Sequence, residues 1–73
     1  MRHTVEAELV ANVLIVCVEP GQSVAADEPV VILESMKMEI PVLAEVAGTV
    51  REVRVTQGDV VNDGDPLAVI DAA

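Results

Sequence analysis

The sequence predicts an all-β domain, a pseudo-two-fold β-sandwich or flattened barrel built from two four-strand halves. The first observation is composition: the 73 residues include no Phe, Tyr or Trp, so aliphatic side chains, above all valine, must build the core. Val and Ile lose χ1 freedom in helices and pack well on pleated strands. The second observation is an internal repeat, and the third is matching Gly and Pro positions in its two copies.

The repeat becomes visible when the chain is shifted by 37 positions. The segment VCVEPGQSVAADEPVVILE (16–34) then lies over VRVTQGDVVNDGDPLAVID (53–71) without a gap. The identical pairs include Val16/Val53, Val18/Val55, Gly21/Gly58, Val24/Val61 and Pro29/Pro66. Neither half can bury its apolar face alone, so the two halves must pack against each other.

Each half contains the same series of elements. A first strand is expected in the apolar run VLIVCV (13–18) and in its copy. A turn follows at EPG (19–21) or TQG (56–58), where glycine suits a positive φ. A short apolar step and a polar turn then lead to a second strand. Pro29 or Pro66 opens that strand, a position where the missing N–H need not break a ladder.

One pair of positions differs sharply between the halves. Arg51 and Glu52, which we expect to face water, are matched by Leu14 and Ile15 in the first half. If the repeat is structurally true, one or both aliphatic side chains lie on the surface and form a docking patch. The alternative is a local bulge that turns them inward.

The charge balance restricts the classes of partner. Four Lys or Arg stand against thirteen Asp or Glu, a formal net charge of −9. This field repels phosphate, so nucleic acid and membrane surfaces are not expected partners. A basic protein surface fits better because opposite fields speed encounter. The alternative is that the acidity only keeps a small domain soluble.

The single cysteine indicates the compartment. Cys17 has no disulfide partner in the chain, which suits a reducing environment, and His3 near the N-terminus is the only histidine. A nucleophilic role for Cys17 is therefore not expected, nor is a metal site. The run VLIVCV is too short to span a bilayer and follows Glu6 and Glu8 rather than a cationic segment. We expect a cytoplasmic protein.

The stretch ESMKME (34–39) occupies a chain reversal but contains no Gly, Asn, Asp or Pro. Tight hairpins usually need those residues because their favoured turns have positive φ. The repeat places this stretch at the junction of the halves, where its counterpart is the pair of chain ends. The hairpin and the termini should therefore project from opposite ends of the sandwich.

Lys37, at the tip of this hairpin, is the only lysine and, apart from the N-terminus, the only primary amine. Exposed Met36 and Met38 would bring no turn propensity, and a broken local rule of this kind marks a functional site. The alternative for one methionine is core filler below the hairpin. Glu34 and Glu39 favour the charged form of the lysine, so another protein must remove its proton and supply an activated acyl group.

The motif ESMKM, followed by IPVLAEVAGTVREVRVTQGDVVNDGDPLAVID, resembles the biotinyl domains of biotin-dependent carboxylases and decarboxylases, the biotin carboxyl carrier proteins. The resemblance covers essentially the whole chain. It implies that residues 1–73 form a single, free-standing, minimal biotinyl domain, a flattened β-barrel or sandwich of two four-stranded antiparallel sheets.

The resemblance also implies the roles of the hairpin residues. Lys37 is similar to the lysine that carries biotin as an amide, Met36 and Met38 to its flanking recognition pair, and Glu34 and Ser35 to the surrounding motif. The implied protein has no catalytic site of its own. A biotin protein ligase modifies it, and it then carries carboxybiotin from a biotin carboxylase to a carboxyltransferase.

Three departures from the family pattern leave the lysine untouched. Ser35 stands where Ala is commoner, Ala11 and Asn12 replace a Gly-containing turn that the second half retains at Gly48, and GQSV replaces the form seen at GDVV. The runner-up interpretation is a lipoyl carrier, which has the same fold but more often Asp-Lys-Ala or Val-Lys-Ala. A third is an unmodified interaction module of the same fold.

Overall fold

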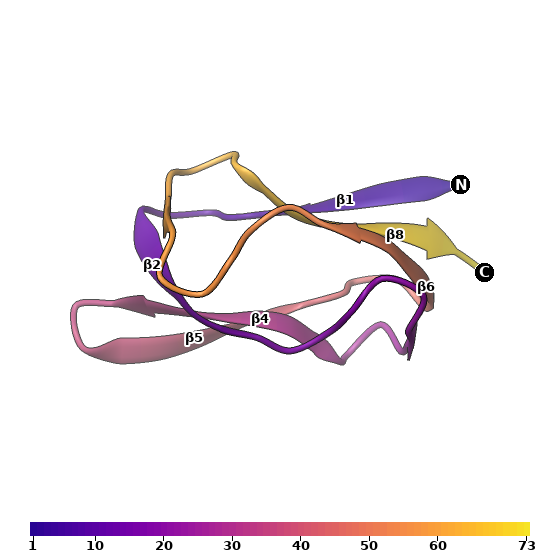
Figure 1. Ribbon diagram of the computed structural model, residues 1–73, viewed down its shortest axis with the longest axis horizontal. Helices are drawn as coiled ribbons and strands as arrows, with labels where there is room; N and C mark the ends of the chain where they lie inside the picture. Colours follow the sequence, from indigo (N-terminus) through magenta and orange to yellow (C-terminus); the bar gives the residue numbers. More distant parts are fainter.

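The computed structural model describes residues 1–73 and contains eight strands and no helix. The strands are β1 (Arg2–Glu6), β2 (Ala11–Val16), β3 (Ser23–Val24), β4 (Pro29–Ser35), β5 (Met38–Leu43), β6 (Gly48–Val53), β7 (Val60–Val61) and β8 (Pro66–Ala72). They form two four-stranded antiparallel sheets that face each other as two layers (Figure 1). The predicted fold class is confirmed. No helix capable of crossing a membrane is present.

The two sheets are related by the same shift of 37 residues that relates the halves of the sequence. The termini sheet has the order β1-β8-β6-β3 and the hairpin sheet the order β5-β4-β2-β7, so each position in one sheet has a counterpart in the other. Each sheet takes two strands from each half of the chain. The halves therefore interlock by exchanging strands, an arrangement that brings their apolar faces together in one core.

The turns of the two halves are also equivalent. Gly21 and Gly58 have φ of 92° and 95°, in the left-handed region that favours glycine. The Oε1 atom of Gln22 accepts a hydrogen bond from the Glu19 backbone N–H at 3.2 Å. Asp59 Oδ2 makes the equivalent bond at 2.8 Å in the second half. Glutamine thus replaces aspartate in the GQSV turn with the same cap retained.

A bulge interrupts the first long strand of each half. The register shifts between Val13 and Ile15 in β2 and between Val50 and Glu52 in β6. Despite the bulge, 46% of Ile15 is exposed, while Leu14 is half-buried. The predicted surface position is therefore confirmed for Ile15, and the predicted bulge is present without turning this side chain inward.

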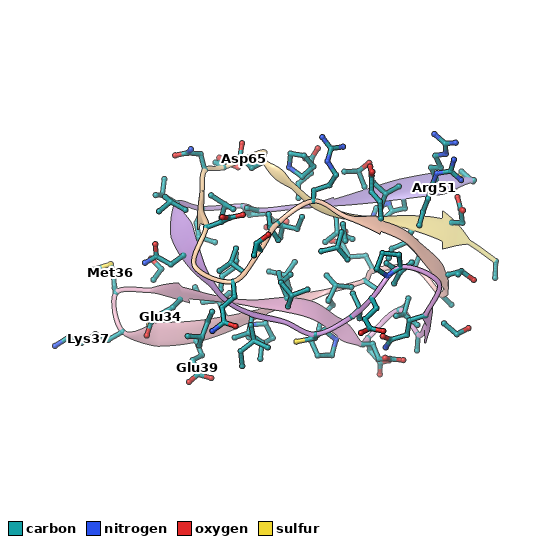
Figure 2. The ribbon with its side chains drawn as sticks, in the orientation of Figure 1. Glu34, Met36, Lys37, Glu39, Arg51 and Asp65 are labelled. Carbon is teal, nitrogen blue, oxygen red and sulfur yellow. The ribbon has the colours of Figure 1, made fainter.

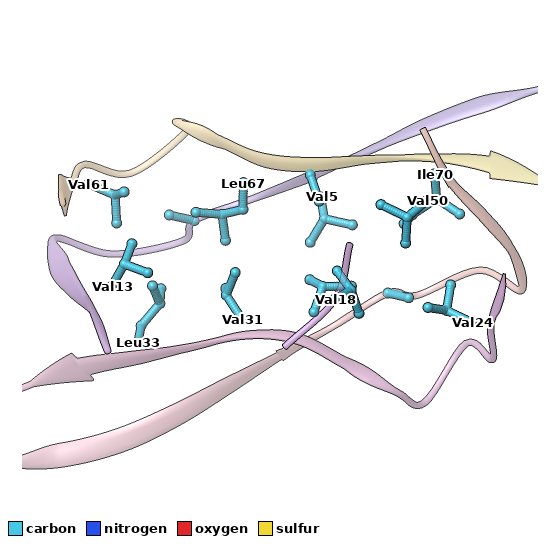
Figure 3. Close-up of a cluster of buried hydrophobic side chains, with 14 of the residues drawn as sticks. Val5, Val13, Val18, Val24, Val31, Leu33, Val50, Val61, Leu67 and Ile70 are labelled. Atoms are coloured by element: carbon cyan, nitrogen blue, oxygen red, sulfur yellow. The ribbon is translucent and has the colours of Figure 1, made fainter. Parts of the chain in front are cut away.

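The core lies between the two sheets and consists only of apolar residues (Figure 3). Most of its members come in pairs from the two halves, such as Val13 with Val50 and Leu33 with Ile70. No polar or charged residue is buried. The long strands therefore pack on one continuous aliphatic core, and this close packing holds the strands that carry the hairpin in a fixed position.

Gly48 does not lie in a turn, so that part of the sequence interpretation is wrong. It is the first residue of β6 and pairs with Ala72 of β8. A Cβ at this position would overlap the backbone carbonyl oxygen of Asp71. Its counterpart Ala11 is accommodated in the core of the other sheet. Gly48 is needed for close approach of two strands, not for a reversal of the chain.

Candidate functional site at the hairpin tip

The hairpin between β4 and β5 closes with a two-residue loop. Ser35 and Met38 form the last pair of the ladder, which leaves Met36 and Lys37 in the loop. Their φ angles are 52° and 66°. Positive φ at both central positions is the pattern of a type I′ turn, which normally takes Asn or Gly. For other L-residues this region costs roughly 1–2 kcal/mol each, so the tip holds a strained backbone.

The three side chains of the Met-Lys-Met motif point into solvent. Met36 is 92% exposed and Met38 64% exposed, so neither methionine is core filler. Lys37 is also exposed and takes part in no ion pair of the structure. Figure 2 shows its side chain extending away from the body of the domain. The tip therefore presents an unpaired amine between two polarisable thioethers.

The termini lie at the opposite end of the molecule, as the repeat predicts (Figure 1). The backbone N–H of Ala72 donates to the carbonyl oxygen of Met1 at 2.7 Å. This pair is the counterpart of Ser35 and Met38 at the base of the hairpin. The domain measures 34 × 17 × 17 Å, so the amine of Lys37 lies at one end of an elongated body and the chain ends lie at the other.

Glu34 and Glu39 do not pair with Lys37 but face each other across the two strands of the hairpin. Like charges at directly opposite positions destabilise a ladder. At the equivalent place in the termini sheet, Asp71 faces Arg2, a pair of opposite charges. The base of the hairpin therefore has an uncompensated negative patch where its counterpart is balanced.

Ser35, the remaining residue of the predicted motif, is half-buried at the end of β4 and opposite Met38. None of the side-chain hydrogen bonds of the structure includes it. Nothing in the structure gives it a role beyond its place in the ladder.

The geometry at the tip supports display of a group, not enclosure of a substrate. The two cavities of the domain, each about 280 Å³, are lined by residues of other segments, and neither includes any residue from 34 to 39. No cluster of His, Cys, Asp or Glu side chains could hold a metal ion. The side chain of Lys37 is instead exposed at the end of the domain.

Comparison with known proteins agrees with this geometry. The sequence pattern of a family described as "Biotin-requiring enzyme", the biotin/lipoyl domain, matches residues 3–70. The chain belongs to the biotin/lipoyl attachment family. A relative from Mycobacterium leprae named "Biotinylated protein TB7.3 homolog" is 54% identical over 70 residues, which cover 96% of this chain and 99% of the relative.

Two solved structures contain domains with a similar fold. The first is a single-chain, multi-domain long-chain acyl-CoA carboxylase, with a TM-score of 0.90 and 36% identity over 99% of this chain. The domain spans only 7% of that much longer protein. The second is the lipoyl domain of the 2-oxoglutarate dehydrogenase complex from Azotobacter vinelandii, with a TM-score of 0.73 and 26% identity, covering 94% of this chain and 99% of that domain.

Sequence reasoning singled out Ile15 but missed two neighbours of Ile15 in the folded domain. Ile32 and Pro41 lie beside it across the hairpin sheet, because Ile15 pairs with Ile32 and Ile32 pairs with Pro41. The signal was available, since the shift by 37 residues matches Pro41 with the polar Thr4. Only the strand pairing shows that the three residues form one row.

Proposed function

We propose that this domain is a biotin carboxyl carrier whose biotin is joined by an amide bond to the ε-amine of Lys37. The observation on which this proposal depends is the presentation of the only lysine, unpaired, on a strained two-residue turn at the end of the domain. The relative named as a biotinylated protein, similar over nearly its whole length, supports biotin as the group.

The residues of the tip fit a covalently attached group. Amide formation consumes the charge of the lysine, and Lys37 has no ion pair that this would break. Exposed Met36 and Met38 offer adaptable apolar contacts to a visiting protein, while Glu34 and Ser35 form the base of the hairpin. When bound, biotin supplies a ureido nitrogen that accepts a carboxyl group and later gives it up.

The proposed cycle needs three partner proteins. A biotin protein ligase deprotonates Lys37 and supplies the activated acyl group, a biotin carboxylase loads the carrier, and a carboxyltransferase unloads it. The domain contributes attachment and mobility, which raise the local concentration of the group at both sites. We place the carrier in the cytoplasm, where the free thiol of Cys17 stays reduced.

Intact-mass spectrometry after incubation with ATP, biotin and a biotin protein ligase tests the attachment site. The wild-type chain should gain the mass of one biotinyl group, and Lys37→Arg should gain none, since a guanidinium is not acylated under these conditions. Arginine keeps the positive charge at the turn, and circular dichroism checks that the variant is folded. Biotin retained on Lys37→Arg would show that the site is wrong.

The likeness to a lipoyl domain makes lipoyl attachment the second candidate. The same experiment with a lipoate ligase and lipoic acid separates the two groups by mass. We expect biotin and no lipoyl group, because two methionines flank the lysine. A chain that takes up neither group, with both ligases active on a control substrate, would indicate an unmodified interaction module.

A further inference from the structure

The outer faces of the two sheets differ although their backbones are equivalent. On the hairpin sheet, Ile15, Ile32 and Pro41 form a row of directly paired residues. Direct partners in antiparallel strands point to the same face of the sheet. The row faces solvent, because Ile15 and Pro41 are exposed and Ile32 is half-buried.

The equivalent row on the termini sheet is mostly polar. Its members are Glu52, Val69 and Thr4, paired in the same way. Two further exposed apolar residues of the hairpin sheet, Leu43 and Val60, also have polar counterparts. These counterparts are Glu6 and Ser23. We call Ile15, Ile32, Pro41, Leu43 and Val60 the apolar face; the fold does not require it, since the other sheet forms without one.

Charge is distributed between the sheets as unevenly as apolar surface. The strands of the hairpin sheet contain only two charged residues, Glu34 and Glu39, and both are negative. These glutamates lie in the row of paired residues next to Ile15, Ile32 and Pro41, on the side of the hairpin tip. The other members of that row are Asn12 and Val60, and Val60 also belongs to the apolar face. The termini sheet and the loop after β6 have ion pairs instead, Arg51 with Asp71 at 3.3 Å and Arg54 with Glu52 at 3.2 Å.

The distribution of apolar and charged residues indicates which kind of partner could bind the apolar face. A second copy of the chain is disfavoured, because it has the same net charge of −9 and its own apolar face offers no Lys or Arg to pair with Glu34 and Glu39. A surface with an apolar centre and Lys or Arg side chains opposite Glu34 and Glu39 is complementary. Such charges at the rim of an interface speed association more than they slow dissociation, which suits a partner that binds and leaves repeatedly.

We propose that the apolar face is the docking surface for the biotin carboxylase of the cycle, a proposal that rests on the proposed function. A ligase must bring its acyl carbon to the Nζ atom of Lys37 and therefore has to close over the tip. A protein that acts at the far end of the lysyl arm can hold the domain by its body. Pro41 is four residues from Lys37, roughly 13 Å along an extended strand, a position suited to such a hold.

NMR titration of the unmodified, isotope-labelled chain tests this assignment. The probe is the purified biotin carboxylase subunit that co-purifies with the biotinylated domain on streptavidin. We expect signal changes at Ile15, Ile32 and Val60 and none at Glu52, Val69 and Thr4. Ile15→Glu should raise the Kd about tenfold, the effect expected from substituting a moderate hot-spot residue. Added salt should also raise the Kd of the wild type.

The controls come from the pseudo-symmetry. Ile15→Glu places in β2 the residue that β6 already has at the equivalent position, Glu52, so the variant should fold. Thr4→Glu adds the same charge to the opposite face and should bind like the wild type. An unchanged Kd for Ile15→Glu, equal weakening by Thr4→Glu, or signal changes confined to the termini sheet would each overturn the docking surface.

Two further outcomes separate this proposal from the proposed function. If the ligase, titrated in the same way, contacts the apolar face and the carboxylase does not, the assignment of the face to the carboxylase is wrong. Biotin attachment at Lys37 is measured by mass and needs no docking surface. A biotinylated chain without the expected titration therefore refutes the docking proposal alone, whereas a chain that takes no biotin refutes the proposed function.

Discussion

The two ends of this domain have nearly the same backbone and different chemistry. At one end, Ser35 and Met38 are joined through a turn whose two residues both have positive φ. At the other end, the equivalent residues are held by the hydrogen bond from Ala72 to Met1, with no connecting turn. The difference indicates which features the fold needs and which serve display, because the two-residue turn with positive φ and the directly opposed carboxylates have no counterpart at the end with the termini.

The core is where the halves should remain equivalent, and its disruption has the largest expected effect. Leu33 and Ile70 are counterparts and both are fully buried. Leu33→Ala and Ile70→Ala should each lower the free energy of unfolding by about 2–5 kcal/mol, through lost burial and the cavity left behind. Urea denaturation measures both. A cost below about 1 kcal/mol for only one of them would show that the core is not symmetric in energy.

The next largest effect on stability is expected at Gly48 and Ala11, which are counterparts in the two sheets. Gly48→Ala should cost about 1–3 kcal/mol, because the new methyl group overlaps the carbonyl of Asp71 and β6 must move. The reverse change at the counterpart, Ala11→Gly, should cost roughly 0.5–1 kcal/mol from backbone entropy, with a further contribution from the lost methyl. Thermal unfolding of both variants checks the order, and a neutral Gly48→Ala would contradict the close approach.

Relief of the strained turn should stabilise the hairpin end. Met36→Asn keeps Lys37 and introduces a residue that tolerates the left-handed region, so the free energy of unfolding should rise by up to about 1 kcal/mol. The rate of biotin attachment by the ligase should fall, because one exposed thioether is lost. Chemical denaturation and a time course of intact mass measure the two effects. Met36→Leu, which keeps an apolar side chain without improving the turn, is the control for stability.

The smallest expected effect concerns the charges at the base of each end. Glu39→Arg gives the hairpin the pairing that Arg2 and Asp71 have at the other end, and should raise stability by about 0.2–1 kcal/mol. Arg2→Glu should lower it by a similar amount. Both differences should shrink in high salt because Glu39 and Arg2 are exposed. A stability difference that is unchanged by salt would mean that charge is not its cause.

Much of the site could be predicted because its signals are local or periodic. The repeat placed the hairpin and the termini at opposite ends, and the motif placed the only lysine between two methionines. The close approach at Gly48 was missed because the reason for this glycine lies in β8, more than twenty residues away along the chain. The pairing of Glu34 with Glu39 was missed as well, since sequence proximity placed both carboxylates around Lys37 instead.

The sequence by itself determined the all-β class, the two equivalent halves and the position of a single amine at a chain reversal. These follow from the preference of Val and Ile for strands, from the internal repeat and from the count of lysines. None of these signals depends on contacts between residues that are distant in the chain. Only the tertiary structure decided how the halves exchange strands and which residues share a face. Those properties depend on the register between strands, and register brings Ile15, Ile32 and Pro41 into one row although they lie far apart in the chain.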